Sequence, residues 1–257
     1  MSPTTDRQQR LRSLRTSKIA QLVANEIVGD IVSRGLKEGD RLPTESTMLE
    51  EFDVGRASIR EALRILEIYG LIRIRQGHKG GPVVADVQPG DLGRTLSLYF
   101  QMIGGTYGDL VEARIVIEPV MARLAAEARD PEGMRHLTEV MEREARAPLD
   151  DPQYMQLADE FHYAVCGMSA NKIIDMLGHS LRTLYTGRIS GRGVYPEEGR
   201  PVTRKLHTEI GEAVLDGDAP LAERLMSEHM REIIELQRKS TPELLDERVS
   251  WQASGGG

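Results

Sequence analysis

Several features of secreted and membrane proteins are missing from this sequence. It has one cysteine, Cys166, which cannot form an intramolecular disulfide and suits a reducing compartment. No apolar run approaches the roughly 18 residues that a membrane-spanning helix needs. The N-terminus, "MSPTTDRQQRLRSLRTSK", is basic but lacks the apolar stretch of a secretory signal. We therefore expect a soluble cytoplasmic protein that makes no contact with a membrane.

Aromatic residues are also scarce, at 4% of the chain, so the core must be mostly aliphatic, as in many helical proteins. The chain is 40% hydrophobic and 28% charged, which is typical of a globular rather than a disordered protein. Its 257 residues suffice for one large domain or for two domains of ordinary size.

Over the whole chain basic residues are fewer than acidic ones, and the net charge is −7. The N-terminal third of the chain is the exception. Residues 1–85 hold 14 Lys and Arg against 11 Asp and Glu, a net charge of +3. The remaining residues hold 19 basic against 29 acidic side chains, a net charge of −10. This asymmetry indicates two modules with different partners, of which the first would attract a polyanion.

The front module has the pattern of a winged helix-turn-helix. Apolar residues recur at helical spacing in "SKIAQLVANEIVGDIVSRG", Thr44 suits the N-cap of a second helix, and a third helix follows over about 57–69. "LIRIRQ" then alternates apolar and cationic residues as a half-buried strand does, "GHKGG" is a turn, and "PVVA" returns as a second strand. In such a module the third helix enters the major groove of DNA and the hairpin touches the backbone or the adjacent minor groove.

Arginines on the third helix give this module a candidate DNA-reading face. Arg56 and Arg60 lie near its N-terminal end, where a guanidinium can donate two hydrogen bonds to O6 and N7 of guanine. Arg64 lies one turn further and could contact the DNA backbone or only solvent, and Ser58 suits a phosphate contact. The alternative is a solvated amphipathic helix with ordinary surface arginines.

The segment "DRLPTESTMLEEFDVGRASIREALRILEIYGLIRIRQG" resembles the signature of the GntR family of bacterial transcription regulators. It shares the Arg-x-Pro-Ser-Glu-like opening, the Arg-x-x-x-Arg-Glu-Ala-Leu recognition helix and the Leu-Glu-x-x-Gly-Leu exit to the wing. Gly55 replaces a usual serine, and the wing tip "GHKGG" differs from the usual Gly-x-Gly. The helix and the resemblance together imply these DNA contacts: Arg41, Thr44, Arg56, Ser58, Arg60, Arg64, His78 and Lys79.

The acidic module shows helical segments without a clear strand pattern, so the fold class is mainly α, with the winged helix-turn-helix followed by an all-α bundle. The expected boundaries are a flexible basic arm at 1–17, the DNA-binding domain at 18–85, a linker at 86–90, the helical domain at 91–239 and a disordered tail at 240–257.

Three histidines on separate predicted helices, His162, His207 and His229, could form a site for a divalent transition metal such as zinc or nickel. The turn "DGDAP" is short enough for antiparallel packing to bring His207 and His229 together. Asp159, three residues before His162, lies on the same helix face and could add an oxygen ligand. A lone helical histidine is more often an ordinary core or surface residue.

The helical module resembles the ligand-binding FCD domain of the FadR-type branch of the family, in "DLVEARIVIEPVMARLAAEA", "DEFHYAVCGMSANKII" and "LHTEIGEAVLDGDAPLAERLMSEHM". Many members bind a metal through three histidines and an aspartate four residues before the first histidine. The three histidines match this pattern, whereas Ala158 occupies the aspartate position and Asp159 is displaced by one residue, about 100° around a helix.

The resemblance further implies a small carboxylate effector that coordinates the metal. Arg114 matches a position that faces the cavity and could pair with the carboxylate. Alternatively, it is a surface arginine paired with Glu118 at i+4. Arg182, Tyr185 and Arg188 are further pocket candidates.

These features predict a transcription regulator, with repressor the favoured direction of control, that binds a pseudo-palindromic DNA operator as a homodimer and responds to a small-molecule effector. A metal-free domain that senses a larger ligand, such as an acyl-thioester, is the alternative. A helical metallohydrolase with Glu160 as general base is the remote alternative, because no nucleophile motif and no phosphate-binding loop accompanies it.

Overall fold

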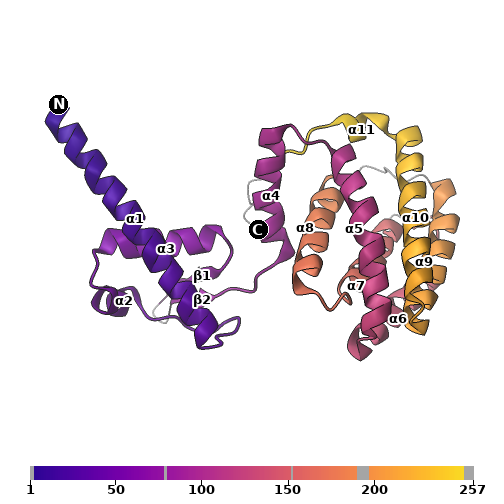
Figure 1. Ribbon diagram of the computed structural model, residues 1–257, viewed down its shortest axis with the longest axis horizontal. Helices are drawn as coiled ribbons and strands as arrows, with labels where there is room; N and C mark the ends of the chain where they lie inside the picture. The colour runs from indigo at the N-terminus through magenta and orange to yellow at the C-terminus, as the bar shows by residue number, and fades with distance from the viewer. Residues whose placement is uncertain (1–2, 78–79, 152, 190–196, 252–257) are drawn as a thin grey trace. The chain divides into compact units, whose positions relative to one another are not determined.

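A computed structural model describes residues 3–77, 80–151, 153–189 and 197–251 of the chain. The chain divides into two compact units, Met1–Asp91 and Leu92–Gly257, each with its own core (Figure 1). Within the described ranges, no helix combines the length and the apolarity needed to cross a membrane.

The N-terminal unit combines three helices with an antiparallel hairpin. Its elements are α1 (Pro3–Ser33), α2 (Glu45–Phe52), α3 (Arg56–Ile68), β1 (Ile72–Arg75) and β2 (Gly81–Val84). Both α1 and α2 pack on α3, and α3 contacts β1. The core is aliphatic apart from Met48, and its fully buried members include Ala20, Ala24, Ile59, Ala62, Leu66 and Ile72. The predicted winged helix-turn-helix is confirmed.

The turn that orients α3 is built by residues with distinct backbone roles. Asp53 ends α2 in the left-handed conformation, with φ 47°, which aspartate tolerates better than most side chains. Gly55 is the N-cap of α3 and offers no side-chain cap. In the wing, Ile72 pairs with Val84 and Arg75 pairs with Gly81, so the antiparallel strands are paired along their whole length.

The expected arm at 1–17 differs from the structure, in which α1 begins at Pro3. Proline is favoured at the first helical position, and the segment that follows is rich in arginine, glutamine and leucine, which are good helix formers. Lys18, the expected start of the domain, is therefore an internal residue of α1, and residues 3–17 extend this helix.

The C-terminal unit is a bundle of helices, as the sequence predicts. Its elements are α4 (Pro89–Ile103), α5 (Tyr107–Ala128), α6 (Pro131–Arg146), α7 (Tyr154–Cys166), α8 (Lys172–Ile189), a 3-10 turn (Glu197–Gly199), α9 (Arg200–Asp216), α10 (Ala219–Ser240) and α11 (Pro242–Asp246). The most extensive packing is between α5 and α10, and α5 also contacts α7, α8 and α9.

Two local features fix the helices that carry the site. Thr106 caps α5 in a capping box with Asp109. Gly217, with φ 78°, ends α9, and the Asp218 side chain immediately caps α10 by accepting from the backbone N–H of Leu221. Because only these two residues join α9 to α10, the two helices lie side by side (Figure 1).

The linker and the tail end elsewhere than the sequence predicts. Helix α4 begins at Pro89, inside the expected linker. The expectation of a disordered tail at 240–257 is wrong for the described residues 240–251, which include α11 and a return to the start of α5. There Val249 donates its backbone N–H to the carbonyl of Gly105 at 2.9 Å, and Leu244 is buried. Burial of apolar side chains holds this segment in place. The polar residues that surround them in the sequence make the segment look like a disordered tail.

Candidate functional site

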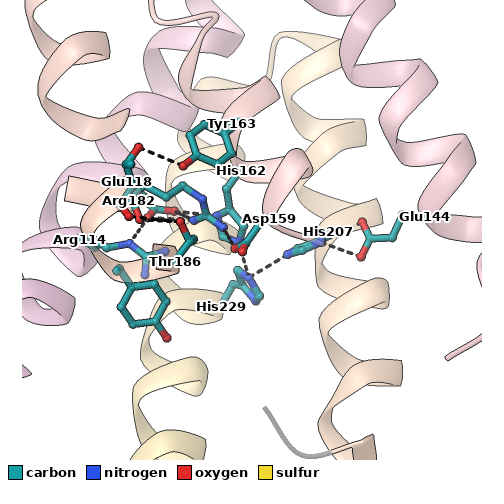
Figure 2. Close-up of polar contacts among 12 residues, drawn as sticks. Arg114, Glu118, Glu144, Asp159, His162, Tyr163, Arg182, Thr186, His207 and His229 are labelled. Carbon is teal, nitrogen blue, oxygen red and sulfur yellow. Dashed lines mark hydrogen bonds and ion pairs between the residues drawn. The ribbon is translucent and has the colours of Figure 1, made fainter. Parts of the chain in front are cut away.

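Three histidines from three helices meet in the core of the C-terminal unit. His162 lies on α7, His207 on α9 and His229 on α10, and each is at most 3% exposed. Nε2 of His229 lies 3.0 Å from Nε2 of His207 and 3.2 Å from Nε2 of His162 (Figure 2). The predicted clustering of these rings is therefore confirmed.

Two buried glutamates stand behind two of the rings and set their tautomers. Nδ1 of His162 is 2.6 Å from Glu118 Oε2, and Nδ1 of His207 is 2.9 Å from both oxygens of Glu144. Because a carboxylate accepts hydrogen bonds, both Nδ1 atoms carry the proton. Both Nε2 atoms therefore present lone pairs toward His229.

The electrostatic environment keeps two of the rings, His162 and His229, neutral and Glu118 charged. Burial lowers the pKa of His162 well below its ordinary value, and the neighbouring Arg182 lowers it further. Burial and the two other rings do the same to the pKa of His229. For Glu118, burial alone would raise the pKa, but Arg114, His162 and Arg182 together hold it well below its usual range.

This arrangement fits a transition metal ion. Nitrogens that bind one ion at about 2.0–2.1 Å stand about 2.8–3.0 Å apart at octahedral angles and about 3.3–3.4 Å apart at tetrahedral angles, a span of about 2.8–3.4 Å. The two distances between Nε2 atoms fall in that range. Nε2 of His229 carries at most one hydrogen, but it faces the lone pairs of two other Nε2 atoms, those of His162 and His207. Hydrogen bonds among the rings can therefore satisfy only one of these lone pairs, whereas a cation at the centre can bind all three nitrogens.

A cluster of arginines adjoins the histidines. Arg114 Nε donates to Glu118 Oε1 at 2.6 Å, and Arg182 Nη1 donates to the same carboxylate at 3.3 Å. The guanidinium of Arg114 also lies 4.2 Å from the ring centroid of Tyr185. All four side chains are buried. Arg114 Nη1 and Arg182 Nε have no hydrogen-bond partner among the described residues, so an added ligand could accept from them.

A cavity of about 30 Å³ lies between the arginines and the histidines. The described residues that line it are Arg114, Met155, Ala158, Asp159, His162, Arg182, Tyr185, Thr203, His207, His229 and Ile233. The structure thus brings together three of the four predicted effector residues. Arg188 is not among the described lining residues and pairs with Glu247, so the structure does not bring it together with the other three.

Asp159 is placed differently from the predicted oxygen ligand. Its carboxylate pairs with Nη2 of Arg182, and the group of side chains able to hold a metal comprises the three histidines alone among the described residues (Figure 2). The physical reason is helical rotation, since the shift by one residue from Ala158 turns the side chain by about 100°. Asp159 faces the arginine side of the cavity.

Glu144 is not predicted from the sequence, in which Glu118 is only a candidate surface partner of Arg114. The i+4 pairing exists, but both side chains are buried and Glu118 also accepts from His162. Tyr154 donates to Glu144 at 2.9 Å, which completes the support behind His207. Glu118 and Glu144 stand at positions of α5 and α6 that otherwise carry apolar side chains, and this pattern could have indicated that both are buried. Glu160, by contrast, pairs with Arg143 and its side chain is 44% exposed, so it does not serve as a base at this site.

The buried neutral histidines predict an acid-sensitive fold. The pKa values of His162 and His229 are lowered from 6.5, so below about pH 6.5 the unfolded chain binds more protons than the folded one. Their stabilising contribution is fully present above that pH and is lost as pH falls. We expect the free energy of unfolding of chelated protein to drop by about 2–3 kcal/mol between pH 7.5 and 5.5, in urea titrations followed by helical circular dichroism.

A matched variant isolates this effect. His229→Gln removes one of the two titrating rings and is expected to halve the drop. An equal stability at the two pH values would contradict the assignment of buried neutral rings. The depressed pKa of Glu118 acts in the same direction only below about pH 4.5, outside this window.

In the N-terminal unit, α3 presents a cationic face opposite its buried face. Arg56, Arg60 and Arg64 are exposed at i+4 spacing, while Ile59 and Leu63 point into the core. The Arg60 side chain is 74% exposed and reaches Glu45 Oε2 at 3.3 Å. Within the N-terminal unit this face is exposed.

The other residues predicted to contact DNA differ in how exposed their side chains are. Arg41 is exposed and donates from Nη2 to the carbonyl of Gly80 at 2.9 Å, bracing the wing. Thr44 caps α2 by accepting from the backbone N–H of Thr47, which confirms its expected capping role. Ser58 is buried, at 5% exposure, because it lies on the inner side of α3, so its hydroxyl is not presented to a phosphate. His78 and Lys79 lie outside the described residues.

The wing strand supplies cations that the sequence interpretation did not select. Arg73 and Arg75 are exposed on β1, two residues apart and therefore on one face of the strand. Arg73 also pairs with Glu38 at 3.6 Å. The alternation of apolar and cationic residues in "LIRIRQ" was the signal for them.

The fold and the sites define a class of protein in which a winged helix-turn-helix head is joined to a helical domain with a buried polar cavity. Residues 19–79 match the family described as bacterial regulatory proteins, gntR family, and residues 109–232 match the FCD domain. The chain belongs to the GntR family of transcription regulators and has a C-terminal FCD domain of the FadR type. The family comprises regulators rather than enzymes.

Named relatives agree with this assignment. The chain is 26% identical over 235 residues to HTH-type transcriptional repressor NanR of Enterobacter sp. (strain 638), covering 90% of this chain and 89% of the relative. It is 27% identical over 228 residues to the protein of the same name from Cronobacter sakazakii, covering 86% of each. Among solved structures, Streptococcus agalactiae GntR shares the fold, with a TM-score of 0.64 and 24% identity over 86% of this chain and 99% of that one.

Proposed function

We propose that this protein is a repressor that binds a pseudo-palindromic DNA operator as a homodimer and is controlled by a small carboxylate bound beside a transition metal ion. The observation that carries the proposal is the convergence of three histidine Nε2 atoms next to a buried Arg114 with an unpartnered N–H. A ligand carboxylate can accept from Arg114 and also occupy an open position on the metal.

The chain's own residues divide the task of binding the effector. His162, His207 and His229 would hold the ion, which supplies a Lewis-acidic attachment point for the ligand when it is bound. Glu118 and Glu144 orient two of the rings by accepting hydrogen bonds from their Nδ1–H groups. Arg114 fixes the carboxylate, and burial of the site excludes competing water.

Two observations support the small carboxylate over a larger ligand such as an acyl-thioester. The cavity is small, and two buried arginines in its lining, Arg114 and Arg182, each have an unpartnered N–H group that a carboxylate can accept from and an apolar chain cannot. The names of the relatives, transcriptional repressors, support repression as the direction of control.

Homodimer formation is supported by exposed apolar side chains on two helices that pack together. Val116 on α5 is 68% exposed, and Ile173 and Leu177 on α8 are 71% and 40% exposed. Exposed apolar surface of this kind is commonly covered by a partner subunit, and a two-fold dimer would present two copies of α3 to the two halves of an operator.

The test begins with DNA ligands selected from a random duplex library by the metal-loaded protein. Affinity for the selected duplex is then measured by fluorescence anisotropy with lactate, malate, gluconate and glucarate in turn. We expect at least one acid to weaken DNA binding by about 5–150-fold, the usual range of allosteric coupling. Failure to select a duplex would overturn the DNA-binding role, whereas tight DNA binding indifferent to every acid would overturn the carboxylate control.

A further inference from the structure

The arginine side of the cavity already contains one carboxylate that belongs to the protein. Asp159 on α7 pairs with Nη2 of Arg182, while Nη1 of the same guanidinium faces Glu118 (Figure 2). The Arg182 side chain is 2% exposed, whereas that of Asp159 is 31% exposed. Asp159 therefore lies at the outer edge of the cavity and occupies the end of Arg182 that an entering anion would meet first.

The charges in this part of the site are balanced before any ligand enters. Two guanidiniums, Arg114 and Arg182, face two carboxylates, Glu118 and Asp159. A divalent ion on the histidines would add two positive charges, and Glu144 behind His207 offsets one of them. Among these groups one positive charge then remains, which a single ligand carboxylate neutralises. A second carboxylate, on the side of Asp159, would leave the same groups with an excess negative charge, which a low-dielectric interior opposes.

We propose that Asp159 sets the charge of the effector by occupying Arg182, so that the site accepts acids with one carboxylate and rejects their counterparts with two. This inference rests on the proposed carboxylate function and adds a specificity-determining residue to it. Arg114, through its unpartnered Nη1, takes the single ligand carboxylate. The second carboxylate of a diacid would face the side chain of Asp159, and like charges at close range disfavour binding.

Pairs of acids that differ chiefly by one carboxylate test the proposal on the full-length, metal-loaded protein. The pairs are lactate and malate, pyruvate and oxaloacetate, and gluconate and glucarate, with affinity measured by isothermal titration calorimetry. We expect the wild-type protein to bind the monocarboxylate of at least one pair about tenfold more tightly than its partner, which corresponds to about 1.4 kcal/mol. Equal or tighter binding of the dicarboxylate in every pair that binds overturns the proposal.

Variants separate the charge of Asp159 from its shape. Asp159→Asn is expected to tighten dicarboxylate binding by about tenfold and to narrow or reverse the preference, because Arg182 becomes available to the second carboxylate. Asp159→Glu keeps the charge and is expected to keep the preference. The matched control is Glu160→Gln, which removes a neighbouring charge that pairs with Arg143 away from the cavity and is expected to leave the ratio unchanged.

The outcomes distinguish this inference from the function on which it rests. An unchanged ratio in Asp159→Asn, with normal metal content, overturns the role of Asp159 while leaving carboxylate control intact. Binding of no acid by any of the proteins overturns the carboxylate function, and the role of Asp159 with it. If Asp159→Asn does not fold, Asp159→Ser serves as the second uncharged variant, and the wild-type ratio still decides.

Discussion

Replacement of His207 by alanine is expected to abolish stable metal binding. Purified wild-type protein should contain about one transition metal ion per chain by elemental analysis, and His207→Ala should contain a small fraction of that. His207 is one of the three ring ligands, its Nε2 lies 3.0 Å from that of His229, and its Nδ1 is held by Glu144. Loss of a support residue typically weakens metal binding about 10–100-fold, so loss of one of three protein ligands should cost at least about 100-fold.

Two further variants sharpen this measurement. His136→Ala removes an exposed histidine on α6 and is expected to keep the full metal content. Glu144→Gln leaves all three ligands in place but weakens the orientation of His207, so its metal affinity should fall between those of wild type and His207→Ala. Absence of metal from the wild-type protein, even after reconstitution with zinc or nickel, would contradict the site and direct ligand screens toward larger apolar or thioester compounds.

Replacement of Arg60 by alanine is expected to weaken binding to the selected duplex by about 1–3 kcal/mol and to relax the preference for one base pair. Arg60 is on the exposed face of α3, near its N-terminal end, and its side chain is 74% exposed. Its ion pair with Glu45 is exposed and worth little, so the arginine can exchange that partner for a guanine edge without a large penalty. Fluorescence anisotropy with the selected duplex and its single-base variants measures both effects.

Arg135→Ala is the matched control, because it removes an exposed helical arginine of the C-terminal unit that pairs with Glu139. It should leave DNA affinity unchanged. A purely electrostatic role for Arg60 would lower affinity equally for all sequences and reduce the salt dependence without changing base preference. Unchanged affinity would remove Arg60 from the DNA-reading face altogether.

The two units of this protein differ in how readily their functional residues are seen in the sequence. In the winged helix-turn-helix, Arg56, Arg60 and the hairpin lie within one short segment, and helical or strand periodicity alone places them. Ser58 shows the limit of that reasoning, since an early helical position suggests exposure, whereas packing of α3 buries it.

In the helical unit, the histidines were recognisable but their surroundings were not. Glu118 is 44 residues from His162, and Glu144 is 63 residues from His207 along the chain. No local spacing encodes such a pairing. The same applies to the ion pair between Arg182 and Asp159. It depends on how α7 is rotated where it packs against α8, which the sequence does not reveal.

The sequence by itself determined the division into a basic and an acidic module, the order of helices and hairpin, the cationic face of α3 and the identity of the three histidines. These properties depend on composition and on periods of two and 3.6 residues, which are local. Tertiary structure decided which carboxylates stand behind His162 and His207, which arginine Asp159 neutralises, and that the segment after α10 packs against the start of α5. Those outcomes depend on how helices rotate and pack against one another, because the free energy gained by burying apolar surface and by pairing buried charges is shared among residues far apart in the chain.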